Sequence, residues 1–171
     1  MTGYVALLRA VNVGGTGKLP MKTLAGLCEA AGLTDVRTYI ASGNVVFRSN
    51  GTEERIRSAL EDQLRAHAGK SVGVLVRTAS EIAGVMADNP FSNAPGNRVV
   101  ALFVDGVLPD DPFDGVTGVA DERICLGTRA LYVLYPNGMA ATRLRIPSEK
   151  HGTARNMNTI AKLAAMAGGL A

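Results

Sequence analysis

Residues 5–20 read VALLRAVNVGGTGKLP and join a continuous apolar run to a glycine-rich segment. The apolar run, residues 5–8, is typical of a central strand with both faces covered. Pro20 suits the first position of a helix, because the N–H that proline lacks would have no partner there. The segment therefore predicts a strand, a glycine-rich loop and a helix in direct succession.

The residues around this segment complete a regular pattern over the first half of the chain. Helices are predicted over 20–31 and 52–68, and further strands over 36–41, 45–48 and 72–77, with a hairpin link at 42–44. The order strand-helix-strand-strand-helix-strand is that of the ferredoxin-like unit, an antiparallel sheet with both helices on one face. Residues 1–78 are therefore expected to form such a unit.

The second half, residues 79–171, repeats this order less regularly. It contains a helix that ends before Asn89-Pro90, strands over 98–104, 122–126 and 130–135, and a final helix that begins near Thr153. Residues 107–121 and 136–152 show no clear pattern. We therefore expect an α+β protein of two ferredoxin-like units, the second degraded, packed together as one compact domain.

The composition limits the classes of protein to consider. A chain of 171 residues with 47% hydrophobic residues can bury a core without a metal ion or disulfides. The net charge of +3 permits nucleic acid or anionic metabolites as partners without requiring either. No apolar run suggests a membrane span and no signal peptide is apparent, so we expect a cytoplasmic protein.

Cysteine and histidine are too few and too scattered for a zinc site. Cys28 and Cys125 lie in apolar contexts and are predicted to be buried and unbridged. The two histidines, His67 and His151, have no ligand spacing. The glycine-rich loop matches neither the Walker lysine loop nor the dinucleotide fingerprint, so no cofactor and no metal are predicted.

The glycine-rich loop is a candidate anion site. It contains Asn12, Gly14 and Gly15, and the cations Arg9 and Lys18 flank it. Glycines let backbone N–H groups come close to a ligand, and the N-terminus of the following helix attracts negative charge. These features favour a small anionic ligand, such as a nucleotide or a phosphorylated metabolite.

The expected topology adds residues to this site. In a ferredoxin-like unit, the loop after the first strand lies at the same end of the sheet as the hairpin turn after the second. Ser42, Asn44 and Lys70 are therefore expected near Arg9. The alternative is a tight turn in which Asn12 and Asn44 bond their own backbone.

Residues 150–156, KHGTARN, form a second candidate region at the expected start of the last helix. We expect Thr153 at the N-cap and Arg155 and Asn156 in the first turn. An arginine there opposes the helix dipole, which is easier to explain if it binds a carboxylate or phosphate. A solvated or acid-paired arginine is the alternative. Our hypothesis is that Arg9 and Arg155 hold the same anion.

Other functions stay open. Tyr39 and Phe47 lie on adjacent predicted strands, where RNA-binding sheets carry aromatic rings. The aromatic and basic signature of those sheets is incomplete, so core packing explains both rings better. A nucleic-acid-binding module is one alternative, and a structural or homo-oligomerising protein without a ligand is another. No catalytic motif is apparent, and no enzyme activity is assigned.

Several of these motifs together resemble a bacterial family of unassigned role, domain of unknown function 1697. In the first half they are Leu7-Leu8-Arg9, Asn12-Val13-Gly14-Gly15, Lys18-Leu19-Pro20-Met21, Tyr39 and Ser42-Gly43-Asn44-Val45-Val46-Phe47, and near the C-terminus Thr153, Arg155-Asn156, Asn158-Thr159 and Lys162-Leu163. The sequence departs from that pattern at Met157, where the family usually shows Trp, and at Ala10, where Gly is common. The resemblance implies an α+β fold of two ferredoxin-like parts and no settled activity. Its two motif regions coincide with the two candidate regions above.

Overall fold

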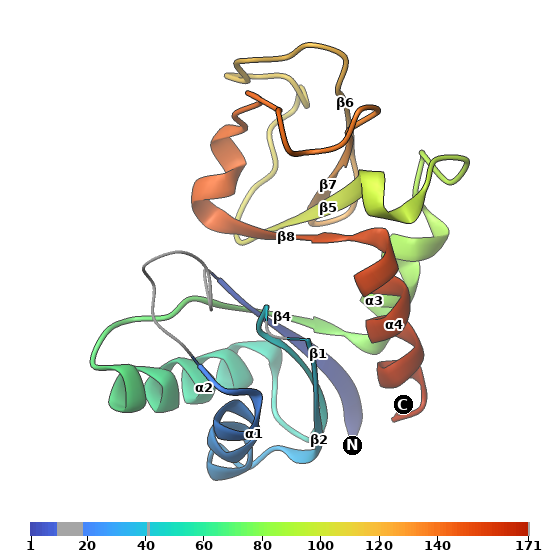
Figure 1. Ribbon diagram of the computed structural model, residues 1–171. Helices are drawn as coiled ribbons and strands as arrows, with labels where there is room; N and C mark the ends of the chain where they lie inside the picture. Colours follow the sequence, from blue (N-terminus) through green and yellow to red (C-terminus); the bar gives the residue numbers. More distant parts are fainter. Residues whose placement is uncertain (10–18, 41, 171) are drawn as a thin grey trace. The chain divides into compact units, whose positions relative to one another are not determined.

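The computed structural model describes residues 1–9, 19–40 and 42–170. The chain divides into two compact units, Met1–Ala83 with Leu163–Ala171 (unit 1) and Gly84–Lys162 (unit 2). Each unit contains one antiparallel four-stranded sheet, and four α-helices complete an α+β protein (Figure 1). The end of the chain thus returns to unit 1, whereas the sequence pattern assigned residues 79–171 to the second unit. The expected packing of both units as one compact domain stays a prediction.

Unit 1 has the order of elements that the sequence predicts. The elements are β1 (Thr2–Leu8), α1 (Met21–Ala30), β2 (Thr34–Tyr39), β3 (Asn44–Ser49), α2 (Glu53–Ala68) and β4 (Val74–Thr78). The strand order is β2-β3-β1-β4, and every neighbouring pair is antiparallel. Pro20 takes the N-cap of α1 and not its first helical position, so the helix begins one residue later than expected.

Local signals in the sequence explain the ends of α2. Thr52 is its N-cap, and the Thr52 side chain accepts a hydrogen bond from the backbone N–H of Arg55. Glu53 and Glu54 lie in the first turn, where the helix dipole favours acids. Gly69 ends the helix in the left-handed conformation with φ 72°, which glycine adopts without a steric cost.

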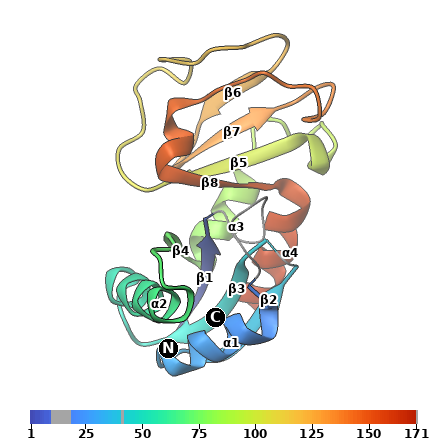
Figure 2. The same cartoon turned by 60° about the vertical axis from the view of Figure 1, so that its left-hand side comes forward.

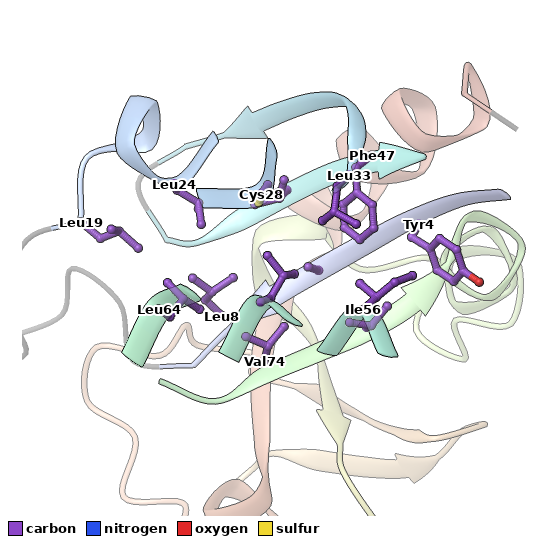
Figure 3. Packing of buried hydrophobic residues seen from close by; sticks show 14 residues of the cluster. Tyr4, Leu8, Leu19, Leu24, Cys28, Leu33, Phe47, Ile56, Leu64 and Val74 are labelled. Atoms are coloured by element: carbon purple, nitrogen blue, oxygen red, sulfur yellow. The ribbon is translucent and has the colours of Figure 1, made fainter. Parts of the chain in front are cut away.

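Helices α1 and α2 cover one face of the sheet (Figure 3). Tyr4, Ala6 and Leu8 point toward the helices because side chains alternate along β1. The same cluster takes in residues from both helices and from the neighbouring strands, namely Leu24, Cys28, Val45, Phe47, Ile56, Leu60, Leu64, Val74 and Val76.

The opposite face of this sheet is buried as well. The strand side chains on that face are almost inaccessible to solvent, namely Val5, Leu7, Val46 and Leu75. Equally buried are three helix residues that belong to unit 1, namely Ile82, Leu163 and Ala167. The prediction that β1 is a central strand with both faces covered is therefore confirmed.

Unit 2 repeats the strand order of unit 1. Its strands are β5 (Val99–Val104), β6 (Arg123–Leu126), β7 (Ala130–Leu134) and β8 (Gly152–Asn156), in the order β6-β7-β5-β8. Helix α3 (Ala79–Ala87) begins in unit 1 and ends in unit 2, and the 3-10 helix η2 (Gly96–Arg98) precedes β5. A capping box begins α3, in which the side chains of Thr78 and Glu81 each accept a hydrogen bond from the backbone N–H of the other residue at 3.1 Å.

The last helix begins later than the sequence analysis expects. Thr153 and Arg155 belong to strand β8, and helix α4 (Met157–Gly168) starts only after Asn156. The side chain of Asn156 accepts from the backbone N–H of Thr159 at 2.9 Å and so acts as the N-cap. The expectation of a cap at Thr153 is wrong because residues 152–156 pair with β5, and this tertiary pairing outweighs the local signal.

The connections of unit 2 differ from those of unit 1. Residues 105–122 join β5 to β6 and residues 135–151 join β7 to β8, and neither connection contains an α-helix (Figure 2). The second connection holds only the 3-10 helix η3 (Pro147–His151). An antiparallel bridge between Thr117 and Arg145 ties the two connections together.

We predict that Leu7→Ala and Leu60→Ala each reduce the free energy of unfolding by about 2–5 kcal/mol, because both side chains are fully buried. Leu126→Ala is the control, since this leucine is 41% exposed in β6 and should cost far less. Urea denaturation measures all three. Losses below about 0.5 kcal/mol for both buried positions would contradict the packing described above.

We also predict that a thiol reagent modifies Cys125 of the native protein quickly and Cys28 only after unfolding. Both thiols are free, as predicted, and Cys28 is buried, but the prediction that Cys125 is buried too is wrong, because it lies half-buried on the edge strand β6. Burial raises the pKa of the Cys28 thiol to about 12. Because the unfolded chain ionises this thiol at lower pH than the folded chain, alkaline pH should also destabilise unit 1. Rapid modification of both cysteines in the native protein would contradict this.

Candidate functional site

Two backbone hydrogen bonds fix the end of strand β1. The N–H of Leu8 donates to the carbonyl of Gly43 and the N–H of Arg9 donates to the carbonyl of Gly73, both at 2.9 Å. The end of β1 therefore lies between the β2–β3 turn and the start of β4. We call Arg9, Ser42, Gly43, Asn44 and Gly73 the β1 rim. The end of β1 and the hairpin turn therefore lie at the same edge of the sheet, as expected, whereas the loop after Arg9 lies outside the described residues.

The side chain of Arg9 runs over Gly73. A Cβ atom built on residue 73 would lie 3.0 Å from Cδ of Arg9, which is tighter than ordinary contact, and 3.5 Å from Cγ of Arg9, which is an ordinary contact. The aliphatic part of Arg9 thus uses the space that a larger side chain at position 73 would fill. Lys70 lies three residues before Gly73, in the segment that joins α2 to β4.

Asn44 holds the β2–β3 turn in place. Its side chain is completely buried, and its Nδ2 donates to the carbonyl of Tyr39 at 3.0 Å and to Oγ of Ser42 at 2.9 Å. These bonds fit the alternative in which the amide serves its own turn. In the rim, Asn44 positions Ser42, and Arg9 and Ser42 are better placed to meet a ligand than Asn44.

The backbone of this turn is strained. Ile40 has φ 46°, in the left-handed region that β-branched residues almost never adopt, and its side chain is exposed. Strain of this kind persists only where the surrounding structure enforces it, and it is common at ligand-binding sites. Gly43 also lies in this region, at φ 81°, without a comparable cost.

Four of the residues predicted to bind the ligand lie outside the described residues. They are Asn12, Gly14, Gly15 and Lys18. Their role at the rim stays a prediction.

Arg155 and Asn156 lie in unit 2. Arg155 is only 8% exposed, and its Nη1 donates to Oγ1 of Thr153 at 2.6 Å and to the carbonyl of Ala154 at 2.9 Å. Burial lowers the pKa of Arg155 to about 10, so its guanidinium stays charged at neutral pH. The argument from an opposed helix dipole does not apply to a residue of a strand. Asn156 caps α4, which explains that residue without a ligand.

Phe47 is a core residue, as predicted. It is fully buried and stacks on Tyr4 with 5.9 Å between the ring centroids. Its ring is therefore not available to stack on a nucleic-acid base. Tyr39, the other ring considered for such a role, is half-buried in β2.

Within residues 1–9, 19–40 and 42–170, no three His, Cys, Asp or Glu side chains gather closely enough to bind a metal ion. None of the helices in these ranges has both the length and the apolar character needed to span a bilayer.

Unit 2 contains a cavity that the sequence does not predict. It measures about 330 Å³ and lies on the sheet beside the connection between β7 and β8. Ten residues of the strands and of that connection line it: Val100, Leu102, Val133, Tyr135, Met139, Ile146, Glu149, Gly152, Thr153 and Ala154. Six of them fall within residues 136–152 or directly next to that range, where the sequence shows no pattern that predicts a cavity.

Comparison with solved structures supports the fold. The chain resembles the conserved bacterial protein SP0830 from Streptococcus pneumoniae, with a TM-score of 0.78 and 23% sequence identity. The similarity covers 97% of this chain and 98% of that one. At this identity the likeness establishes the shared fold only. No curated protein shows significant similarity to the chain.

The family indicated by the sequence motifs is confirmed. A family model described as "Protein of unknown function (DUF1697)" matches residues 1–132. This range includes Met1–Ala83 of unit 1 and, in unit 2, strands β5 and β6 and the first part of β7. Since this match covers well over half of the sequence, the chain belongs to the DUF1697 family.

Proposed function

We propose that the protein binds a small anionic ligand, a nucleotide or a phosphorylated metabolite, at the β1 rim. One observation carries the proposal: the hydrogen bonds from Leu8 to Gly43 and from Arg9 to Gly73 bring Arg9 and Ser42 to one edge of the sheet. The glycine-rich segment leaves β1 at this same edge.

The residue types at the rim suit a phosphate or carboxylate. The planar guanidinium of Arg9 can donate two parallel hydrogen bonds to such a group, and its aliphatic part rests on Gly73. Ser42 offers a hydroxyl, and Lys70 adds positive charge from the neighbouring segment. The strained backbone at Ile40 also supports a binding role for the turn.

We also infer that both units are ferredoxin-like. The identical strand orders, β2-β3-β1-β4 and β6-β7-β5-β8, support this reading, and α1 and α2 complete it in unit 1. In unit 2 the helices between the strands are replaced by irregular connections. We expect the protein to act in the cytoplasm, where two free cysteines are usual.

We predict that Arg9→Gln weakens the binding of inorganic pyrophosphate and of adenosine monophosphate by about tenfold or more, because hydrogen bonds between charged groups are the strong ones. Titration calorimetry measures the affinities. The matched control is Arg48→Gln, which removes the same charge from the other end of the sheet. There Arg48 pairs with Gly3 of β1, and its Nη1 lies 3.6 Å from Oδ2 of Asp35.

The control should change the affinity by less than about twofold, and both variants should keep the melting temperature of the parent protein. Equal losses in the two variants would show that general positive charge, and not the rim, attracts the anion. A short RNA that binds with a steep salt dependence, in the absence of saturable pyrophosphate binding, would instead favour the nucleic-acid-binding alternative.

The shared role of Arg9 and Arg155 gives a separate prediction. If both arginines hold one anion, Arg9→Lys and Arg155→Lys each weaken pyrophosphate binding, and the double variant loses less than the sum of the two effects. Since Arg155 is buried, the folding of its variant must be checked by thermal denaturation. Unchanged affinity in folded Arg155→Lys would remove Arg155 from the site and leave the rim proposal intact.

A further inference from the structure

The two units cover equivalent sheet faces in different ways. In unit 1, α1 and α2 fill one face with Leu24, Cys28, Ile56, Leu60 and Leu64. In unit 2, the corresponding face is covered by the two connections, from which five described residues join the core cluster, namely Leu108, Val116, Tyr135, Leu144 and Ile146. The cavity of about 330 Å³ occupies space on the face that the connections leave uncovered.

The floor of this cavity is apolar. Val100 and Leu102 of β5 and Val133 of β7 belong to the core cluster of unit 2, and all three line the cavity. Met139 is 47% exposed and lines it too, and a methionine adapts easily to the shape of a ligand. The volume lies within the usual range for small-molecule sites, roughly 300–1,000 Å³.

The polar groups of the cavity give it a negative end. Among the described residues that line it, Glu149 alone carries a charge at neutral pH, and Tyr135 contributes a phenol. The pKa of Tyr135 is raised first by burial and then by the negative charges of Glu149 and Glu122, so both carboxylates lie near the phenol.

The walls are held in place before any ligand arrives. Backbone hydrogen bonds join Thr117 and Arg145 in both directions, at 2.9 and 3.1 Å. The carboxylate of Glu122 accepts from the N–H of Ala120 at 2.8 Å and from the hydroxyl of Thr142 at 2.5 Å. These bonds fix both connections, and Glu122 is thereby committed to the loops. Glu149 lines the cavity itself.

We propose that this cavity is a second binding site, for a small molecule with an apolar body and a protonated amine. The apolar body rests on Val100, Leu102 and Val133, and the ammonium group faces Glu149 and the hydroxyl of Tyr135. This site is independent of the β1 rim, which lies in unit 1 and favours ligands of the opposite charge.

Three indole compounds of nearly equal size test the proposal: tryptamine, tryptophol and indole-3-acetate, which are cationic, neutral and anionic. The protein contains no tryptophan, so the fluorescence of a bound indole can be followed without interference from the chain. Tryptamine should bind in a saturable manner and at least about tenfold more tightly than indole-3-acetate. The reason is that the ammonium group of tryptamine forms an ion pair with Glu149, whereas Glu149 repels the carboxylate of indole-3-acetate.

Two variants locate the binding. Ala154→Leu adds bulk at an exposed position of β8 that lines the cavity and should abolish tryptamine binding without loss of stability. Its control, Ala66→Leu on the exposed surface of α2, should bind tryptamine normally. Glu149→Gln should remove the preference for tryptamine over tryptophol, whereas Glu54→Gln on α2 should keep it.

Normal tryptamine binding by folded Ala154→Leu would overturn the proposal, as would equal affinity of the parent protein for all three compounds. If the cavity instead receives a second copy of the chain, light scattering should show a dimer that Ala154→Leu dissociates, and this result would also overturn it. Pyrophosphate binding by Ala154→Leu and Glu149→Gln should be unchanged, which separates this test from that of the β1 rim.

Discussion

The pairing of β1 with β3 on one side and β4 on the other determines the structure of unit 1. Residues 4–8 are buried on both faces of the sheet, so β1 cannot shift along its neighbours without exposing apolar side chains. The register of these pairs places Leu8 and Arg9 between Gly43 and Gly73. The position of Arg9, and with it the candidate site, follows from this constraint.

The sequence was most informative where local signals and the tertiary structure agree. The apolar run of β1 forms a central strand as expected. The cap at Thr52, the glycine after α2 and the reciprocal box of Thr78 and Glu81 follow the residue preferences of helix ends. The order of elements in unit 1 could therefore be predicted, and with it the edge at which Arg9, Ser42 and Asn44 meet.

The sequence was least informative where long-range pairing decides the structure. Thr153 resembles a helix cap, but its segment pairs with β5, and the cap is formed by Asn156 three residues later. The cavity of unit 2 was not predicted because it results from what the two connections leave uncovered, and irregular connections carry no periodic signal. The role of Asn44 was likewise open until its two hydrogen bonds showed that it secures the turn.

The same strand order thus supports two different kinds of surface in one chain. Where helices cover the sheet, as in unit 1, the apolar face is filled, and the site that we propose lies at the edge of the sheet. Where loops cover it, as in unit 2, the apolar face itself keeps a cavity. Folds do not determine function, and the two sites proposed on these equivalent strands would prefer ligands of opposite charge.

Nuclear magnetic resonance of the backbone amides during a pyrophosphate titration tests the central claim most directly. We expect saturable shifts of the amide signals of Arg9, Gly43 and Asn44, with a single dissociation constant, while amides at the other end of the sheet, such as that of Arg48, stay unchanged. Shifts that spread evenly over exposed lysines and arginines without saturation would contradict an anion site at the β1 rim.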